Sequence, residues 1–222
     1  MPEETPFPLG YGTAARWLGD PPPEADLAAI LQKSDPPQVL VSGGARAAWD
    51  ALKAFVGSRG AGQAARDAAE AHWALLQDPF GPRLNPYASV YLDGARLGPA
   101  LVGFRAFLKR WELVPDRERY RDLEDHAAFQ LDCLAWLGSE AERDGKWAGA
   151  YRECLERHVL PWMPRFLADL AAEDRRLPRG GFYAPLAQLV SAWLAHDAAA
   201  LGVGVVPGAG PLGKPPQGPP LS

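Results

Sequence analysis

LEDHAAFQLDCLAWL, residues 123–137, is the stretch that decides the fold. At about 100° per residue, its apolar side chains cover a little over half of a helix circumference, which indicates a helix at the centre of a bundle. His126 and Gln130 fall four residues apart inside this apolar face, where a polar group without a partner costs about 1–3 kcal/mol. They therefore bond each other or a neighbouring backbone carbonyl, or they border a groove that an incoming chain fills. The apolar face consists of Leu123, Ala127, Phe129, Leu131, Cys133, Leu134, Trp136 and Leu137.

The rest of the 222 residues carries the same helical signal. Ala, Leu, Arg and Glu, which favour helices, dominate, whereas β-branched residues and alternating apolar and polar runs are scarce. The composition predicts an all-α protein of roughly nine helices, with Ser42 and Asp116 as N-caps of the third and the sixth. The expected helices span residues 10–19, 24–33, 44–57, 61–78, 97–113, 117–137, 139–157, 159–175 and 181–201.

Three segments do not read as helix. DPFGPRLNPYASVYLDG, residues 78–94, has too many prolines and glycines for regular structure, yet its apolar side chains need something to pack against. The charged stretch LVPDRERYRD places a subdomain boundary near Val114, which divides the chain into residues 1–114 and 115–201. The last segment, residues 202–222, contains six Gly and six Pro, which predicts a disordered tail.

Charge and composition narrow the class of protein. The net charge of −4 does not indicate nucleic-acid binding, which needs an excess of positive charge. No apolar run is long enough to span a membrane, and the first residues do not form a secretory signal. Two cysteines are too few for a disulfide framework, so we expect a cytoplasmic protein. Residues 112–144 carry ten acidic and four basic side chains. This excess is either a solvated helix face or an acidic rim that attracts a basic peptide.

No motif indicates an enzyme or a cofactor. The four histidines form no H-x-x-x-H or H-E-x-x-H pair, and no G-x-S-x-G is present. GAGPLGK, residues 208–214, fits G-x-x-x-x-G-K, but Pro215 stands where a phosphate-binding loop has Ser or Thr. We therefore expect neither a metal site, nor a nucleotide site, nor any other bound cofactor.

Three segments together resemble the TorD/DmsD family of molybdoenzyme maturation chaperones, with the nitrate-reductase chaperones as a related branch. PYASVYLD at 86–93 is similar to the family's P-x-x-S-V-Y loop, and LEDHAAFQLDCLAWL to its Asp-His helix. HVLPWMPRFLADL, followed by FYAPLAQLVSAWL, is similar to its H-L-x-x-W-x-P-x-F helix and its closing helix. The order and spacing agree over about residues 60–200.

The resemblance implies an all-α, TorD-like bundle in two subdomains joined by a hinge, and a protein that is not an enzyme. Such chaperones bind the twin-arginine leader of a molybdoenzyme catalytic subunit precursor in the cytoplasm and hold it until its cofactor is inserted. Matched residue by residue, the resemblance assigns peptide binding to Asp125, His126, Gln130, Pro86, Tyr87, Tyr91, Trp73 and Leu76. Asp125 would orient the leader's arginines, and the aromatic side chains would hold its apolar stretch.

The chain departs from the family pattern at one of these positions and at the residue before Asp125. Glu124 replaces a proline, and Gln130 lies near a position where glutamate is common. Two alternatives from other classes remain. One is a helical metal-binding protein that uses His126 with another histidine, and the other is a scaffold that dimerises through residues 78–93. The sequence leaves open whether the protein is a monomer or a homodimer.

Overall fold

The computed structural model describes residues 10–32, 43–118 and 120–204. Within these ranges, β-structure is limited to one isolated bridge, so the prediction of an all-α bundle is confirmed. The α-helices are α1 (Tyr11–Gly19), α2 (Glu24–Gln32), α3 (Gly43–Arg59), α4 (Ala61–His72), α5 (Ala88–Asp93), α6 (Pro99–Arg110), α7 (Ala127–Arg143), α8 (Ala148–Glu153), α9 (Met163–Asp174) and α10 (Tyr183–Leu201). Shorter segments are the π-helices η1 (Trp73–Gln77) and η3 (Cys154–Val159) and the 3-10 helix η2 (Gly145–Trp147).

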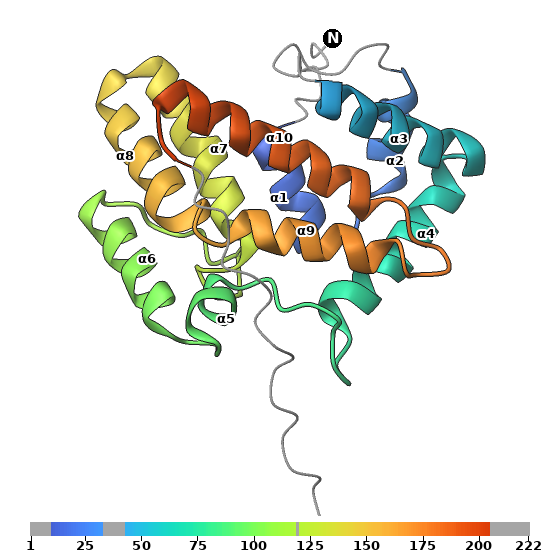
Figure 1. Ribbon diagram of the computed structural model, residues 1–222, viewed down its shortest axis with the longest axis horizontal. Coiled ribbons are helices and arrows are strands. Elements are labelled where there is room, and N and C mark those ends of the chain that lie inside the picture. The colour runs from blue at the N-terminus through green and yellow to red at the C-terminus, as the bar shows by residue number, and fades with distance from the viewer. Residues whose placement is uncertain (1–9, 33–42, 119, 205–222) are drawn as a thin grey trace, which may run out of the picture.

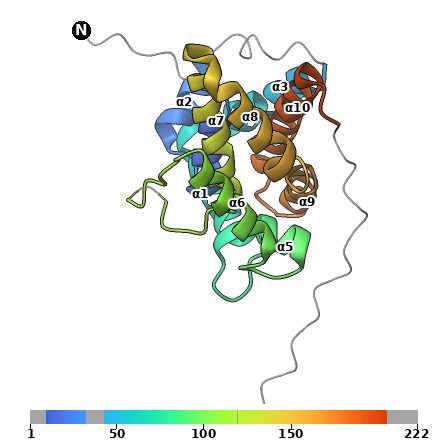
Figure 2. The same cartoon turned by 90° about the vertical axis from the view of Figure 1, so that its left-hand side faces the viewer.

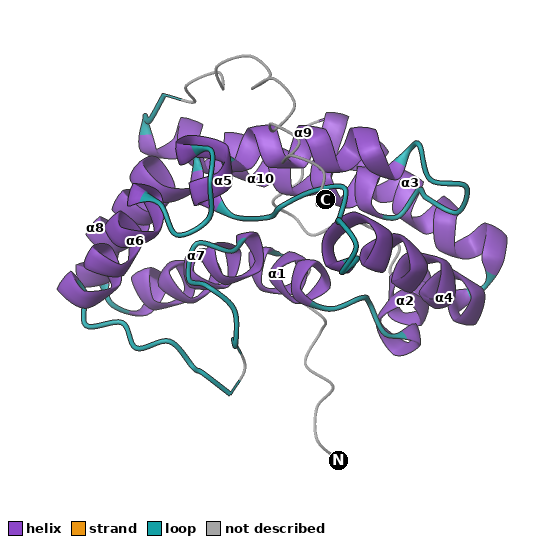
Figure 3. Cartoon of the chain, turned by 90° about the horizontal axis from the view of Figure 1, so that it is seen from below, coloured by secondary structure: helices purple, strands orange, loops and turns teal. Residues whose placement is uncertain are grey.

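Helices from the two ends of the chain pack against each other. α1 lies along α7, while α10 packs against both α3 and α9. Figure 1 shows α10 crossing the molecule with α9 beside it, and Figure 3 shows α7 and α1 in one row with α9 and α10 in another. The largest fully buried side chains belong to one core cluster; they include Trp17, Trp49, Trp162, Tyr183, Phe104 and Phe166.

The buried core runs across the predicted boundary at Val114. α1 and α3 precede this residue, and α7 and α10, against which they pack, follow it. One continuous cluster of buried apolar residues includes members from both sides. The division into residues 1–114 and 115–201 stays a prediction, and the described residues share one core across it.

The helix predicted over 117–137 begins ten residues later than expected, at Ala127. Asp116 is not its N-cap, because His126 has extended backbone angles and accepts the capping hydrogen bond from Ala128. Residues 111–118 and 120–126 instead form irregular structure that stands out from the helices in the side view of Figure 2. Glu124 fixes this irregular structure, because it is buried and pairs with Arg105 and Arg117.

Two other predicted boundaries also differ. The break expected after residue 137 falls at Asp144, which ends α7 and caps η2 by accepting a hydrogen bond from the backbone N–H of Lys146. The segment predicted as a loop over 78–94 contains α5, which Gly94 ends in the left-handed conformation at φ 79°. One boundary is set by the side-chain cap of Asp144 and the other by the left-handed backbone of Gly94, and apolar periodicity detects neither.

Some sequence-based expectations fall outside the described residues. They concern Ser42 as an N-cap, most of the tail at 202–222, and the GAGPLGK stretch at 208–214. Among the helices that are described, none has the length and apolar character needed to cross a membrane.

Candidate functional site

Two segments that the sequence singled out, residues 86–93 and 123–137, meet at Tyr87 and His126. These two residues form an antiparallel β-bridge, and the residues beside them exchange backbone hydrogen bonds of 2.9 and 2.8 Å. The rings of Tyr87 and His126 lie edge to face with their centroids 5.1 Å apart. The two motifs therefore form one structural unit.

Asp125 is fully buried in this unit. Its Oδ2 accepts a hydrogen bond of 2.9 Å from the backbone N–H of Ser89, in the first turn of α5. A carboxylate at a helix N-terminus satisfies a backbone donor and is stabilised by the helix dipole. Asp125 thus caps α5 from a distant part of the chain, and its burial does not support the predicted contact with an incoming arginine.

His126 caps the N-terminus of α7. Its Nδ1 accepts a hydrogen bond of 3.1 Å from the backbone N–H of Ala128. Only a neutral imidazole with its proton on Nε2 can accept at Nδ1. Burial lowers the pKa of His126 to about 4, against the opposing effect of Asp122 and Asp125, so the ring is neutral at pH 7.

Gln130 does not border a groove. Its side chain is buried, and its Oε1 accepts a hydrogen bond of 2.8 Å from the indole Nε1 of Trp162. The amide is therefore satisfied by a partner on the stretch that precedes α9. The expectation that Gln130 contacts an incoming chain is not supported by this placement.

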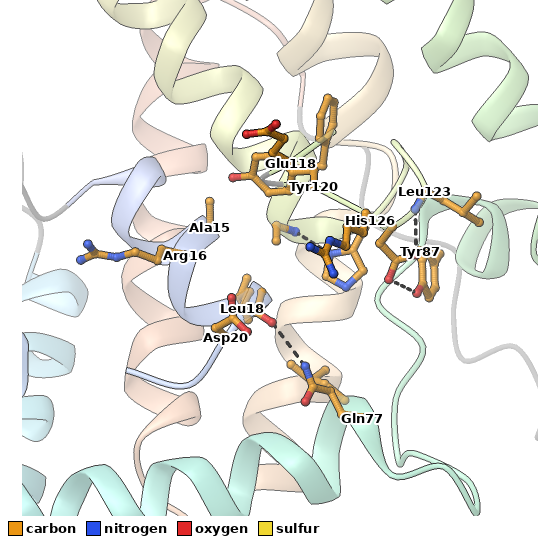
Figure 4. A pocket seen from close by; sticks show the side chains of 16 residues that line it. Ala15, Arg16, Leu18, Asp20, Gln77, Tyr87, Glu118, Tyr120, Leu123 and His126 are labelled. Carbon is orange, nitrogen blue, oxygen red and sulfur yellow. Dashed lines mark hydrogen bonds between the residues drawn. The ribbon is translucent and has the colours of Figure 1, made fainter. Parts of the chain in front are cut away.

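A pocket of about 460 Å³ opens beside His126. We call it the α1–α7 pocket, because α1, the end of η1, the 118–126 segment and the start of α7 form its walls (Figure 4). Three of the predicted site residues, Leu76, Tyr87 and His126, line it. The other lining residues are Ala15, Arg16, Leu18, Gly19, Asp20, Gln77, Glu118, Tyr120, Arg121, Asp122, Leu123, Ala128 and Phe129.

The pocket carries carboxylates that the sequence analysis did not select. Asp20 and Glu118 are exposed and form no ion pair with any residue that the structure describes. Asp122 accepts a hydrogen bond of 2.6 Å from the Tyr87 hydroxyl and lies 3.5 Å from a guanidinium nitrogen of Arg96. Burial and the bond to Asp122 raise the pKa of Tyr87, so its hydroxyl stays protonated and donates.

Sequence patterns could not have identified Asp20. It follows α1, about one hundred residues before the Asp-His motif, and no local motif marks it. Glu118 and Asp122 were counted in the acidic stretch at 112–144, which the sequence leaves open as a solvated helix face or as a rim that attracts a basic peptide. Their true position depends on the irregular path of residues 111–118 and 120–126.

The remaining predicted residues lie outside the pocket. Trp73 is 49% exposed on η1, and Pro86 is buried. The Tyr91 hydroxyl donates a hydrogen bond of 3.1 Å to Asp169, and its ring packs against Trp162. Trp73, Pro86 and Tyr91 therefore do not line the α1–α7 pocket.

The described part of the chain shows no arrangement of three or more His, Cys, Asp or Glu side chains that could hold a metal ion. His126 is committed to capping α7 through Nδ1. The site therefore offers hydrogen-bond donors, carboxylates and apolar surface, which suit the binding of a peptide.

Comparison with known proteins agrees with this description. A family model described as nitrate reductase delta subunit matches residues 40–168. The chaperone protein TorD of Vibrio cholerae is 30% identical over 118 residues, which cover 50% of this chain and 52% of TorD. The Tat proofreading chaperone DmsD of Salmonella typhi is 28% identical over 127 residues, which cover 55% of this chain and 56% of DmsD.

A third relative is also named a chaperone, and its similarity to this chain covers a shorter stretch. The selenate reductase assembly chaperone protein of Thauera selenatis is 38% identical over 61 residues, 24% of this chain and 32% of the relative. The chain spans about half the length of the TorD and DmsD relatives that it matches. Because the family model covers more than half of the chain, the chain belongs to the nitrate reductase delta subunit family, the family of the TorD- and DmsD-like chaperones.

Proposed function

We propose that this protein is a cytoplasmic chaperone that binds the twin-arginine leader of a molybdoenzyme catalytic subunit in the α1–α7 pocket. The observation that carries the proposal is that exposed carboxylates, which form no ion pair with the residues that the structure describes, meet an apolar floor beside the Asp-His motif. Asp20 and Glu118 supply the carboxylates, and Leu18, Leu76 and Phe129 supply the floor. The chaperone names of the relatives support the same class of function, and none of those names is that of an enzyme.

The leader's two arginines would pair with Asp20 and Glu118. A guanidinium can bind a carboxylate through two parallel hydrogen bonds, which fixes the orientation of the peptide. Exposed pairs of this kind contribute only about 0–1 kcal/mol each. Their role is therefore to set the register of the leader, and the apolar contacts provide most of the affinity.

His126 would supply the one directed hydrogen bond from the pocket to the peptide backbone. Its neutral ring carries a proton on Nε2, and no residue that the structure describes accepts a hydrogen bond from that nitrogen. A carbonyl of an extended peptide is a suitable acceptor. In this revised proposal Asp125, Gln130 and Pro86 keep the pocket in shape and do not touch the leader.

Binding of the leader would determine where the catalytic subunit is held. A catalytic subunit whose leader is held by this protein stays in the cytoplasm while its cofactor is inserted. The chaperone itself needs no catalytic group and no cofactor for this role. Its proposed partner is the subunit precursor, with no nucleic acid involved.

Calorimetry with a synthetic twin-arginine leader tests the proposal. The wild-type protein should bind the leader with one site, and a peptide with both arginines replaced by glutamine should bind several-fold to about thirtyfold more weakly, because two exposed pairs contribute up to about 2 kcal/mol. The double variant Asp20→Asn with Glu118→Gln should show a similar loss with the unaltered leader. Equal binding of the two peptides by wild-type protein would refute the assignment.

A matched control separates local recognition from overall charge. Glu142→Gln removes one carboxylate from the exposed end of α7, away from the lining of the pocket. This variant should keep the wild-type affinity for the leader. If Glu142→Gln weakens binding as much as Glu118→Gln does, a diffuse attraction explains the effect and the pocket does not.

A further inference from the structure

A second pocket, of about 510 Å³, lies beside α7. We call it the tryptophan pocket, because Trp136 and Trp147 form part of its wall. None of the residues that the sequence assigned to peptide binding lines it. Its other lining residues are Leu108, Glu112, Leu113, Val114, Pro115, Asp116, Tyr120, Phe129, Asp132 and Cys133.

The walls of the tryptophan pocket are apolar and open to solvent. Trp136 is 44% exposed and Val114 is 90% exposed, which is unusual for side chains of this kind. The Trp136 and Trp147 rings meet edge to face at 5.1 Å and so present a fixed aromatic surface. Exposed aromatic surface held rigidly in a concavity is typical of a site that binds another chain.

The charged residues that line the tryptophan pocket all have the same sign. Glu112, Asp116 and Asp132 are acidic, and no lysine or arginine is among the described residues that line the pocket. Such a rim favours a neutral or cationic segment and disfavours an acidic one. Glu112 also holds a left-handed backbone conformation at φ 56°, a strain that non-glycine residues adopt rarely and mostly at functional sites.

The two pockets are adjacent, because two residues belong to the walls of both. Tyr120 and Phe129 line both, and their rings lie edge to face with centroids 5.2 Å apart. A chain that leaves the α1–α7 pocket therefore needs to pass only these two rings to enter the tryptophan pocket. An extended peptide advances about 3.3 Å per residue, so a few residues suffice for the crossing.

We propose that the tryptophan pocket binds the apolar stretch that follows the arginine pair of the leader. This inference rests on the proposed function, because it assigns the arginines to the α1–α7 pocket. The aromatic walls match the apolar side chains of this stretch, and the acidic rim is compatible with it because the stretch carries no negative charge. The site is thus bipartite, with polar recognition on one side of Tyr120 and Phe129 and apolar recognition on the other.

The rate at which Cys133 is alkylated can be used to measure whether this pocket is occupied. It lines the tryptophan pocket and is partly buried, whereas Cys154 is fully buried and does not line it. Full-length leader should slow the alkylation of Cys133 several-fold, measured by mass spectrometry. A shortened peptide that ends after the arginine pair should give no such protection, even at a concentration that saturates the α1–α7 pocket.

Two variants make the test independent of any single side chain. Trp136→Ala and Val114→Asp should each weaken binding of the full leader about tenfold in calorimetry and abolish protection of Cys133. Val102→Asp is the matched control, because Val102 is 64% exposed on α6 and lines neither pocket. It should keep the wild-type affinity and protection.

The outcomes separate this inference from the proposed function. If the full leader binds in an arginine-dependent way, but Cys133 reacts at its free rate and Val114→Asp binds like wild type, the bipartite site is overturned and the chaperone proposal stands. If no leader binds at all, both proposals fail. Circular dichroism of each variant confirms that a loss of binding does not reflect unfolding.

Discussion

The indole of Trp162 donates a hydrogen bond of 2.8 Å to the side-chain oxygen of Gln130, and both side chains are buried. The bond links the middle of α7 to the turn before α9. It explains why a polar residue occupies the apolar face of α7 without opening a groove there. The amide is part of the core, and its partner is 32 residues away in the sequence.

Replacing Gln130 with leucine should therefore cost stability and not peptide affinity. The substitution leaves the buried Trp162 N–H without an acceptor, which costs about 1–3 kcal/mol. Chemical denaturation measures the loss. Gln188→Leu, on the exposed side of α10, is the matched control and should change the unfolding free energy by less than about 0.5 kcal/mol. Equal effects of the two substitutions would contradict a structural role for Gln130.

Asp125 should likewise affect α5 more than the leader. Asp125→Ala removes the acceptor of the Ser89 N–H, and the loss of an N-cap typically costs about 1–2 kcal/mol. Hydrogen exchange at Ser89 should become faster, while Asp125→Asn, which retains an acceptor oxygen, should stay closer to wild type. If Asp125→Ala instead abolishes leader binding with unchanged exchange and stability, the direct contact with arginine would be reinstated.

Gln130 and Asp125 show that some features of this protein can be predicted from its sequence and others cannot. Local patterns identified α1 and α2 almost to the residue, because apolar spacing and the proline run at 21–23 define their ends without help from the rest of the chain. The start of α7 was not predictable in this way. It depends on the bridge between Tyr87 and His126, which joins segments about 40 residues apart.

The candidate site likewise contains residues that the sequence predicted and residues that depend on contacts between distant segments. The resemblance selected His126, Tyr87 and Leu76, which do line the α1–α7 pocket. It also selected Asp125, which lies next to His126 in the sequence but points into the core. Asp20 reaches the pocket only because α1 packs against α7, and nothing near Asp20 in the sequence indicates that contact.

Gly180 offers a test of the turn between α9 and α10. A Cβ atom at this position would lie 1.8 Å from the carbonyl oxygen of Asp174, a backbone atom that cannot move aside. Gly180→Ala should therefore lower the thermal midpoint by several degrees or prevent folding. At Gly103, on α6, an added Cβ meets nothing within 4 Å. Gly103→Ala should be neutral or stabilising by up to about 1 kcal/mol.

His72 should make the protein less stable in mild acid. Its Nδ1 lies 2.8 Å from the Tyr183 hydroxyl, which is also within hydrogen-bonding distance of the carbonyl oxygen of Trp17. Either tautomer of the neutral ring can form this bond, because the tyrosine hydroxyl can donate or accept. Burial lowers the pKa of His72 from 6.5 to about 4, although Asp20 opposes the shift.

The sign of the pH effect follows from this difference. Between pH 6.5 and about 4 the unfolded chain binds a proton at His72 and the folded chain does not, so stability falls as the pH is lowered through this window. The full effect for one such histidine is about 3 kcal/mol. The pKa values of His126 and His158 are also lowered to about 4, so they add to the slope in the same direction.

His72→Gln should reduce this dependence without removing it. Urea denaturation at a series of pH values from 7 to 4 measures the slope of the unfolding free energy, which should fall by about one proton in the variant. His196 is exposed on α10, so His196→Gln is the matched control and should leave the slope as it is in wild type. A slope that is the same in His72→Gln and wild type would mean that the imidazole is already protonated in the folded protein. The imidazolium would then donate from Nδ1 to the Tyr183 hydroxyl oxygen.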